Sequence, residues 1–130
     1  MAGIGVDLIS IDRIEKVYSR YGEKFLKRIF TTREIEIFMH RGARISTLAA
    51  CFAAKEAVLK ALGCGIGPAE LNEVEIITSS GHQPEVNLLG KAHVIAQEKG
   101  INQVALSLTH EPPFACAFAV AVSAYPRGLN

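Results

Sequence analysis

Two acidic residues and a lysine stand where their side chains could assist the transfer of a phosphate group. Asp7 follows a short apolar run, and Glu56 falls on the apolar face of a predicted helix. Carboxylate oxygens are the ligands that magnesium prefers, and magnesium keeps several waters and takes phosphate oxygens. Lys60 lies four residues after Glu56, on the same side of a helix. These residue types favour metal-assisted phosphoryl transfer.

Each candidate residue also has a structural explanation that the spacing leaves open. Asp7 alone could cap the helix that follows it. His110, at the end of a predicted strand, could be a hydrogen-bonded structural histidine. Glu56 and Lys60 could form a surface ion pair on an ordinary core helix. Residue types alone therefore do not separate a catalytic site from a structural one.

The elements that must position these residues centre on a long helix that begins near Ser46. Six alanines between residues 45 and 61 favour helix and let another backbone or a ligand approach closely. Its buried face is expected to carry Glu56, because that residue shares helical spacing with Ile45, Leu48, Phe52 and Leu59. A carboxylate on a buried face needs a cation or strong donors in place of water.

Alternating glycines end the central helix in a turn. Gly63, Gly65 and Gly67 leave the backbone free to adopt positive φ and to approach something bulky. Exposed backbone amides in such a turn can bind anions, and Lys55 and Lys60 would add positive charge. The turn and the two lysines are therefore expected to bind phosphate groups.

The remaining pattern predicts an α+β fold in one domain spanning residues 1–130, with an N-terminal strand, a helical block and then a mostly antiparallel sheet. The predicted strands cover residues 3–9, 74–78, 85–89, 104–110 and 114–124. The other predicted helices cover residues 10 to about 27, 31–40 and 89–99. The last strand is apolar on both faces, so it is expected to lie in the centre of a sheet.

A stripe of positive charge is predicted on the first helix, which Ser10 or Asp12 would cap. Its members repeat at steps of three and four and are Arg13, Lys16, Arg20, Lys24 and Lys27. Residues 11–44 carry nine Lys and Arg against five Asp and Glu, although the whole chain has a formal net charge of only +1. This asymmetry favours an acidic partner, and a solvated helix face is the alternative.

Composition narrows the class of protein. A chain of 130 residues with 49% hydrophobic residues can bury a core without metals or disulfides. The near-neutral charge gives no field that points to nucleic acid. Three widely spaced cysteines (Cys51, Cys64 and Cys116) without a CxxC pair favour reduced thiols and a cytoplasmic location. The sequence shows no secretory signal, and no apolar run reaches membrane-spanning length.

Three motifs together resemble one enzyme family. They are GIGVD at residues 3–7, FAAKEA at 52–57 with KALG at 60–63, and SLTH at 107–110. Their order, their spacing and the chain length are similar to those of holo-[acyl-carrier-protein] synthases, the small trimeric type of 4′-phosphopantetheinyl transferase. The resemblance implies the fold of that family. It also implies transfer of the phosphopantetheine arm of coenzyme A to a serine of apo acyl carrier protein, in support of fatty acid biosynthesis, with release of adenosine 3′,5′-bisphosphate.

The resemblance also implies roles for individual residues. Asp7 and Glu56 would bind magnesium together with the coenzyme A pyrophosphate, and Lys60 would contact the same phosphates and stabilise the leaving group. The carrier serine also needs a base, and apart from the resemblance we expect Glu56 to take its proton, either directly or through a metal-bound water. His110 and the turn at Gly63 and Gly65 would line the coenzyme A site.

Three further expectations follow from the resemblance. Arg13 and Arg20 would contact the acidic carrier protein. The subunits would form a homotrimer with coenzyme A in clefts between neighbours. Cys51 stands where the family commonly has arginine, so one contact to cofactor or partner is expected to differ.

Two other classes of function remain open at this point. One is a different magnesium-dependent enzyme that acts on a nucleotide pyrophosphate. The other is a non-catalytic module that binds coenzyme A or carrier protein. A module that only binds would not need the acidic pair of Asp7 and Glu56, so the sequence favours an enzyme.

Overall fold

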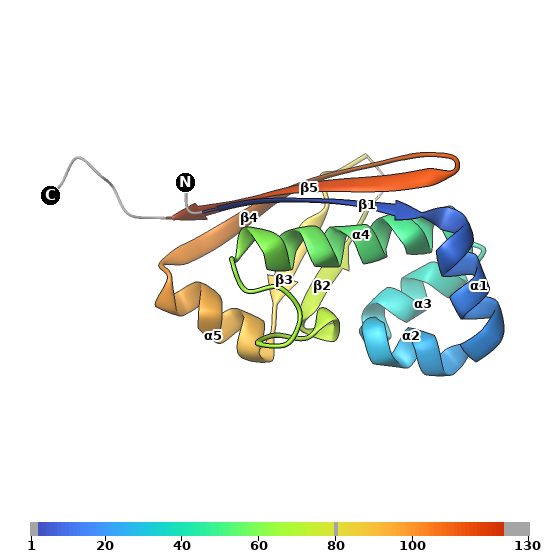
Figure 1. The fold of residues 1–130 in the computed structure, drawn as a ribbon, viewed down its shortest axis with the longest axis horizontal. Coiled ribbons are helices and arrows are strands. Elements are labelled where there is room, and N and C mark those ends of the chain that lie inside the picture. Colours follow the sequence, from blue (N-terminus) through green and yellow to red (C-terminus); the bar gives the residue numbers. More distant parts are fainter. Residues whose placement is uncertain (1–2, 80, 124–130) are drawn as a thin grey trace, which may run out of the picture.

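A three-stranded antiparallel sheet packed on one long helix forms the frame of the molecule (Figure 1). The computed structural model describes residues 3–79 and 81–123. The strand order is β1 (Gly3–Ser10), β5 (Phe114–Ser123) and β4 (Ile101–Glu111), and α4 (Ile45–Ala61) lies along one face of this sheet. The central position predicted for the last apolar strand is confirmed, because β5 pairs with strands on both sides.

Smaller elements surround this frame and match the predicted α+β order. In Figure 1 one group of helices gathers at the N-terminal end of α4, and α5 (Gly90–Glu98) lies near its C-terminal end. The helices in that first group are α1 (Ile11–Tyr21), α2 (Glu23–Ile29) and α3 (Thr32–His40). After α4 come η1 (Leu71–Glu73), β2 (Val74–Ile77), β3 (Glu85–Leu88) and α5 (Gly90–Glu98). The predicted antiparallel hairpin is confirmed, with β2 and β3 paired in a sheet of their own.

The predicted ends of the last two strands need small corrections. Strand β4 begins at Ile101, three residues before the predicted start, and continues through His110 to Glu111. Strand β5 ends at Ser123, and Ala124 of the predicted strand lies outside the described residues.

Two glycines let β1 lie directly on α4. A Cβ on Gly3 would overlap the carbonyl oxygen of Ala61, and a Cβ on Gly5 would overlap that of Ala57. Ala57 and Ala61 are themselves fully or almost fully buried at this contact. Small residues on both partners therefore bring the two backbones close, and Asp7 follows on the same face of β1 because side chains alternate along a strand.

The single helix predicted from residue 10 to residue 27 is wrong. Ser10 caps α1 by accepting a hydrogen bond from the Arg13 backbone N–H at 3.3 Å, so Asp12 is not the cap. Gly22, with φ of 54°, ends α1 and starts α2. Glycine adopts this backbone conformation without steric cost, which permits the sharp change of direction. Consequently Arg13, Lys16 and Arg20 share α1, whereas Lys24 and Lys27 lie on α2.

The prediction that α4 buries a single face is wrong, although Leu48 and Leu59 of that face are buried and Glu56 is partly buried. Helix α4 is buried on nearly all sides, and its fully buried ionic residue is Lys55, with 0% exposure. Glu56, the next residue, is only half-buried. An alanine-rich helix enclosed by a sheet, a hairpin and three helices does not show the one-sided pattern of a surface helix.

The sheet face that points away from α4 is apolar and open. Ile4, Val6 and Leu8 on β1 are 56%, 54% and 61% exposed. Phe114 and Phe118 on β5 are each 46% exposed, and Phe118 lies opposite Val6 in the strand register. Contiguous exposed apolar residues of this size are typical of a surface that another protein covers.

Candidate active site

Asp7 and Lys60 form an ion pair where β1 crosses α4. The Lys60 Nζ lies 3.2 Å from Asp7 Oδ1 and donates to the backbone carbonyl of Val6 at 3.0 Å. Asp7 was predicted at the end of its strand, but β1 continues for three more residues to Ser10. The carboxylate therefore projects from within the sheet toward the helix, and its side chain is only 12% exposed.

Glu56 faces the same carboxylate from the preceding turn of α4. Loss of water through burial raises the pKa of Glu56 above its ordinary value of 4.5, and the negative charge of Asp7 raises it further. Lys60 offsets part of this effect. Glu56 and Lys60 do not form the surface ion pair that was left open as a structural alternative, because Lys60 bonds to Asp7 instead. Among the described residues, Glu56 therefore faces a neighbouring carboxylate without an ion-pair partner of its own.

An open cavity of about 310 Å³ gives access to both carboxylates. Asp7 and Glu56 line it together with Arg13, Phe25 and Phe52. The rings of Phe25 and Phe52 stack with centroids 6.4 Å apart and give the cavity an apolar wall beside the acids. Arg13 brings α1 to the edge of this cavity.

The two carboxylates suit a magnesium ion whose other ligands are waters and phosphate oxygens of a bound substrate. Across residues 3–79 and 81–123, no group of three or more His, Cys, Asp or Glu side chains is arranged to hold a metal. Magnesium, however, is commonly bound through one or two carboxylates, with waters and substrate phosphates completing the octahedron. Asp7 and Glu56 supply that number of ligands beside open space, so they suit a metal that arrives with its phosphate ligand.

The glycine turn lies immediately beyond the C-terminal end of α4. Gly63 and Gly65 have φ of 79° and 66°, in the left-handed region predicted for them. The Lys99 Nζ donates to the carbonyl oxygen of Leu62 at 2.6 Å, and a Cβ on Gly63 would lie 2.8 Å from that nitrogen. Lys99 thus binds the end of α4 where carbonyls lack helical partners. Lys99 was not among the predicted site residues, because nothing in the sequence around it connects α5 with this turn.

His110 does not join the Asp7 and Glu56 site within one chain. It lies on β4, and β5 separates that strand from β1, so the two strands are about 10 Å apart. His110 instead lines a second cavity of about 180 Å³ together with Cys51 and Glu34. Residues of α4 contribute to both cavities from different sides of the helix.

Cys51 occupies a protected position in the second cavity. Its thiol donates to Glu34 Oε2 at 3.6 Å. Burial, followed by the negative charge of Glu34, raises the pKa of the Cys51 thiol well above its ordinary value. The position where the family commonly has arginine therefore carries a neutral, weakly nucleophilic group beside an existing carboxylate.

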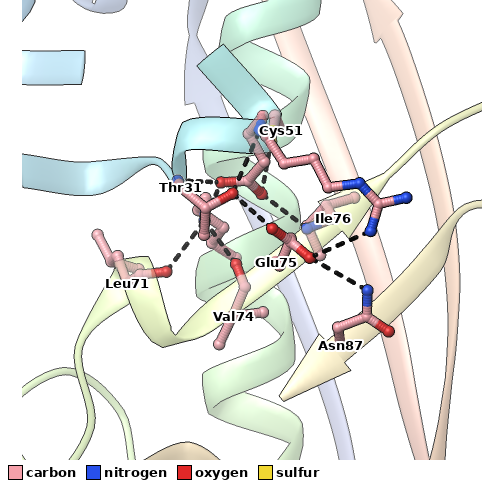
Figure 2. Close-up of polar contacts among 10 residues, drawn as sticks. Thr31, Cys51, Leu71, Val74, Glu75, Ile76 and Asn87 are labelled. Atoms are coloured by element: carbon pink, nitrogen blue, oxygen red, sulfur yellow. Dashed lines mark hydrogen bonds and ion pairs between the residues drawn. The ribbon is translucent and has the colours of Figure 1, made fainter. Parts of the chain in front are cut away.

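Lys55 is sealed in the interior, so the prediction that it binds phosphate is wrong. Its Nζ lies 2.7 Å from Glu34 Oε1, and the two side chains are 0% and 2% exposed. The same nitrogen donates to the carbonyl oxygens of Leu71 and Val74. Figure 2 shows these carbonyls converging on one buried polar cluster.

The partner of Lys55 is also fully hydrogen-bonded. Glu34 accepts from the backbone N–H groups of Thr31 at 2.8 Å and Ile76 at 2.6 Å (Figure 2). Thr31 caps α3 and forms a capping box with Glu34, and its hydroxyl donates to Glu75 at 2.7 Å. The TxxE spacing at residues 31–34 indicates the cap, but only the tertiary structure reveals that the same glutamate neutralises Lys55.

The remaining predicted site residues lie on α1. Arg13 and Arg20 are exposed and separated by two turns of the same helix. The Arg20 guanidinium lies 5.4 Å from the ring centre of Tyr21. Both cations are therefore available to a partner that approaches the helix beside the carboxylate cavity.

Within the described part of the chain, no helix is long and apolar enough to cross a membrane. The three cysteines are unpaired, as their number and spacing predict.

Comparisons with known proteins assign residues 3–119 to a family described as the 4′-phosphopantetheinyl transferase superfamily. A holo-[acyl-carrier-protein] synthase from Desulforudis audaxviator is 47% identical over 120 residues, which cover 92% of each protein. A crystal structure of holo-[acyl-carrier-protein] synthase from Neisseria meningitidis is similar with a TM-score of 0.86 and 35% identity, covering 95% of this chain and 99% of that one. A crystal structure of the Helicobacter pylori synthase in complex with coenzyme A is similar with a TM-score of 0.80 and 33% identity, covering 92% of this chain and 99% of that one.

Proposed function

Since this chain belongs to the 4′-phosphopantetheinyl transferase superfamily and is a transferase, we propose that it transfers 4′-phosphopantetheine from coenzyme A to a serine of apo acyl carrier protein. The products are holo carrier protein and adenosine 3′,5′-bisphosphate, and the reaction supports fatty acid biosynthesis. The observation that carries the proposal is the pair of carboxylates, Asp7 and Glu56, beside Lys60 at an open cavity.

The bond changes assign a task to each side chain. The serine oxygen forms a bond to the β-phosphorus of coenzyme A, and the bond from that phosphorus to the bridging oxygen breaks. Glu56 accepts the serine proton, either directly or through a water. Lys60 faces the negative charge that develops on the departing bisphosphate. Magnesium, held by Asp7 and Glu56, would supply neutralisation of the pyrophosphate charge.

The coenzyme A site is proposed to be complete only in a homotrimer. His110 lines a different cavity from Asp7 in the same chain, so a ligand held by both needs His110 from a neighbouring copy. The exposed apolar face of β1 and β5 offers the surface for that association, with Val6 and Phe118 side by side. Coenzyme A would then lie between neighbours, against the Gly63 and Gly65 turn of one of them.

The carrier protein is proposed to dock on α1. Arg13 lines the carboxylate cavity and Arg20 lies two turns further on, so an acidic carrier bound there would present its serine to Glu56. We place the reaction in the cytoplasm, where the three unpaired cysteines would stay reduced.

The direct test is the mass of apo carrier protein after incubation with the chain, magnesium and coenzyme A. A mass gain of one phosphopantetheine per carrier, absent when the carrier serine is replaced by alanine, is the expected result. Release of adenosine 3′,5′-bisphosphate without carrier would indicate a different pyrophosphate-cleaving enzyme. Binding of coenzyme A without any transfer would indicate a binding module.

A further inference from the structure

Lys60 forms an ion pair with Asp7, one of the two carboxylates proposed to bind the metal. Its Nζ bonds to both Asp7 Oδ1 and the carbonyl oxygen of Val6, and this places a positive charge at the edge of the carboxylate cavity. A divalent cation between Asp7 and Glu56 would meet repulsion from this ammonium as well as competition for the same oxygen. The site is therefore poorly prepared for a metal as long as Lys60 stays in place.

The Lys60 side chain can leave Asp7 readily. It is 51% exposed, and an exposed lysine is a point charge on a flexible stem whose ion pairs contribute little stability. A pyrophosphate in the cavity offers negatively charged acceptors in exchange for Asp7. Movement of Lys60 to those acceptors frees the Asp7 oxygen and removes positive charge from the metal position.

We propose that Lys60 holds Asp7 in the ligand-free protein and releases it to a pyrophosphate-bearing ligand, so that the divalent cation and the pyrophosphate bind cooperatively. The inference concerns the same site as the proposed function and rests on it. Lys60 then determines how strongly the two ligands are coupled, in addition to contacting phosphate. Because linkage is reciprocal, the metal must strengthen pyrophosphate binding by the factor with which pyrophosphate strengthens metal binding.

The test measures metal binding without turnover. Free Mn²⁺ is titrated by electron paramagnetic resonance against the full chain, with and without saturating coenzyme A and with no carrier protein. In the wild type, coenzyme A should tighten Mn²⁺ binding by a factor within the usual coupling range of about 5–150. Lys60→Met should bind Mn²⁺ more tightly than the wild type when coenzyme A is absent. Coenzyme A should then tighten Mn²⁺ binding by a smaller factor in the variant than in the wild type.

Two control variants keep the result specific. Lys24→Met removes one positive charge from an exposed residue of α2 that does not line the carboxylate cavity, and it should leave both Mn²⁺ constants unchanged. Lys60→Arg keeps the charge and should preserve most of the coupling. If Lys60→Met leaves the coenzyme A-free Mn²⁺ constant unchanged or weakens it, Lys60 does not compete with the metal and the proposal is overturned.

A failure of the proposed function gives a different pattern. If Asp7→Asn does not weaken Mn²⁺ binding even with coenzyme A present, the metal is not at this site, and the coupling proposal falls with it. If Asp7→Asn abolishes Mn²⁺ binding and the wild-type protein produces the carrier-protein mass gain, the proposed function stands. The constants of Lys60→Met then decide the coupling proposal alone.

Discussion

The two lysine–carboxylate pairs on α4 differ in the water that reaches them. Lys55 and Glu34 are 2.7 Å apart, and both side chains are essentially inaccessible. Lys60 and Asp7 are 3.2 Å apart, with the lysine half exposed. Glu34 is also held by backbone N–H groups of Thr31 and Ile76, which leaves it no capacity for a ligand. The open pair keeps that capacity, so surroundings rather than residue type separate a structural ion pair from a functional one.

Removing a carboxylate at the open site should cause the largest effect on activity. Asp7→Asn or Glu56→Gln should lower turnover by at least about a hundredfold, because each would remove a proposed metal ligand and with it several kcal/mol of transition-state stabilisation. The carrier-protein mass assay in saturating magnesium measures this. Cooperative melting curves would show that the variants remain folded, and wild-type rates in either variant would contradict the assignment of Asp7 and Glu56 as the metal pair.

Removing one partner of the sealed pair should instead affect folding. Lys55→Met leaves Glu34 buried without its cation, so the free energy of unfolding should fall by about 3–5 kcal/mol. Lys60→Met is the matched control, and its loss should stay within about 1 kcal/mol. Denaturant titration gives both values. The comparison breaks down if the two variants are equally stable.

A second variant sharpens the comparison at the sealed pair. Replacing Lys55 and Glu34 together by methionine removes both buried charges, so it should recover part of the stability that Lys55→Met loses. A further loss would mean that the backbone bonds of Glu34 contribute more than its charge pairing with Lys55.

The open site should also leave a signature in the pH dependence of stability. The pKa of Glu56 in the folded protein is raised above its ordinary value of 4.5. Protonation of Glu56 therefore contributes stability that is fully present below about pH 4.5. This stability is lost as the pH rises through the pKa of the folded protein. Glu56→Gln, which does not titrate, should therefore stabilise the metal-free protein at neutral pH and give little advantage at about pH 4. Denaturant titrations of both proteins at the two pH values measure the difference. If Glu56→Gln changes the free energy of unfolding equally at both pH values, the change would come from packing and not from the Glu56 charge.

The smallest expected effect lies at the edge of the open site. Replacing Arg13 and Arg20 by glutamine should raise the Michaelis constant for carrier protein and flatten its dependence on salt, with little change for coenzyme A. The break at Gly22 supplies a control, because Lys24→Gln with Lys27→Gln removes equal charge from another helix. If both double variants change the salt slope equally, net charge rather than docking on α1 explains the effect.

Local patterns predicted most of the fold and only part of the site. The hairpin of β2 and β3 follows from spacing within a few residues, and this prediction is confirmed. The break at Gly22 was missed, because the apolar and basic repeats continue through it.

The errors at the site have a common physical origin. Helical spacing placed Glu56 rather than Lys55 in the interior, because an alanine-rich helix shows almost no one-sided pattern. The partner of Lys55 lies 21 positions earlier, at Glu34, and the partner of Lys60 lies on β1. Such pairings depend on tertiary packing, which no local window contains. The roles of Asp7, Glu56 and His110 in catalysis and binding stay predictions.

The close contact between β1 and α4 also limits how this sequence can vary. Gly3 and Gly5 face helix carbonyl oxygens with no room for a methyl group, whereas Ile4, Val6 and Leu8 point to the open side of the sheet. If every position of β1 is substituted in turn, tolerance to substitution should therefore alternate from one residue to the next. Positions 3 and 5 would accept glycine alone, while positions 4, 6 and 8 would accept many apolar residues. Alanine at position 5 would push the strand from the helix and shift Asp7, so its defect should appear in metal binding as well as in stability.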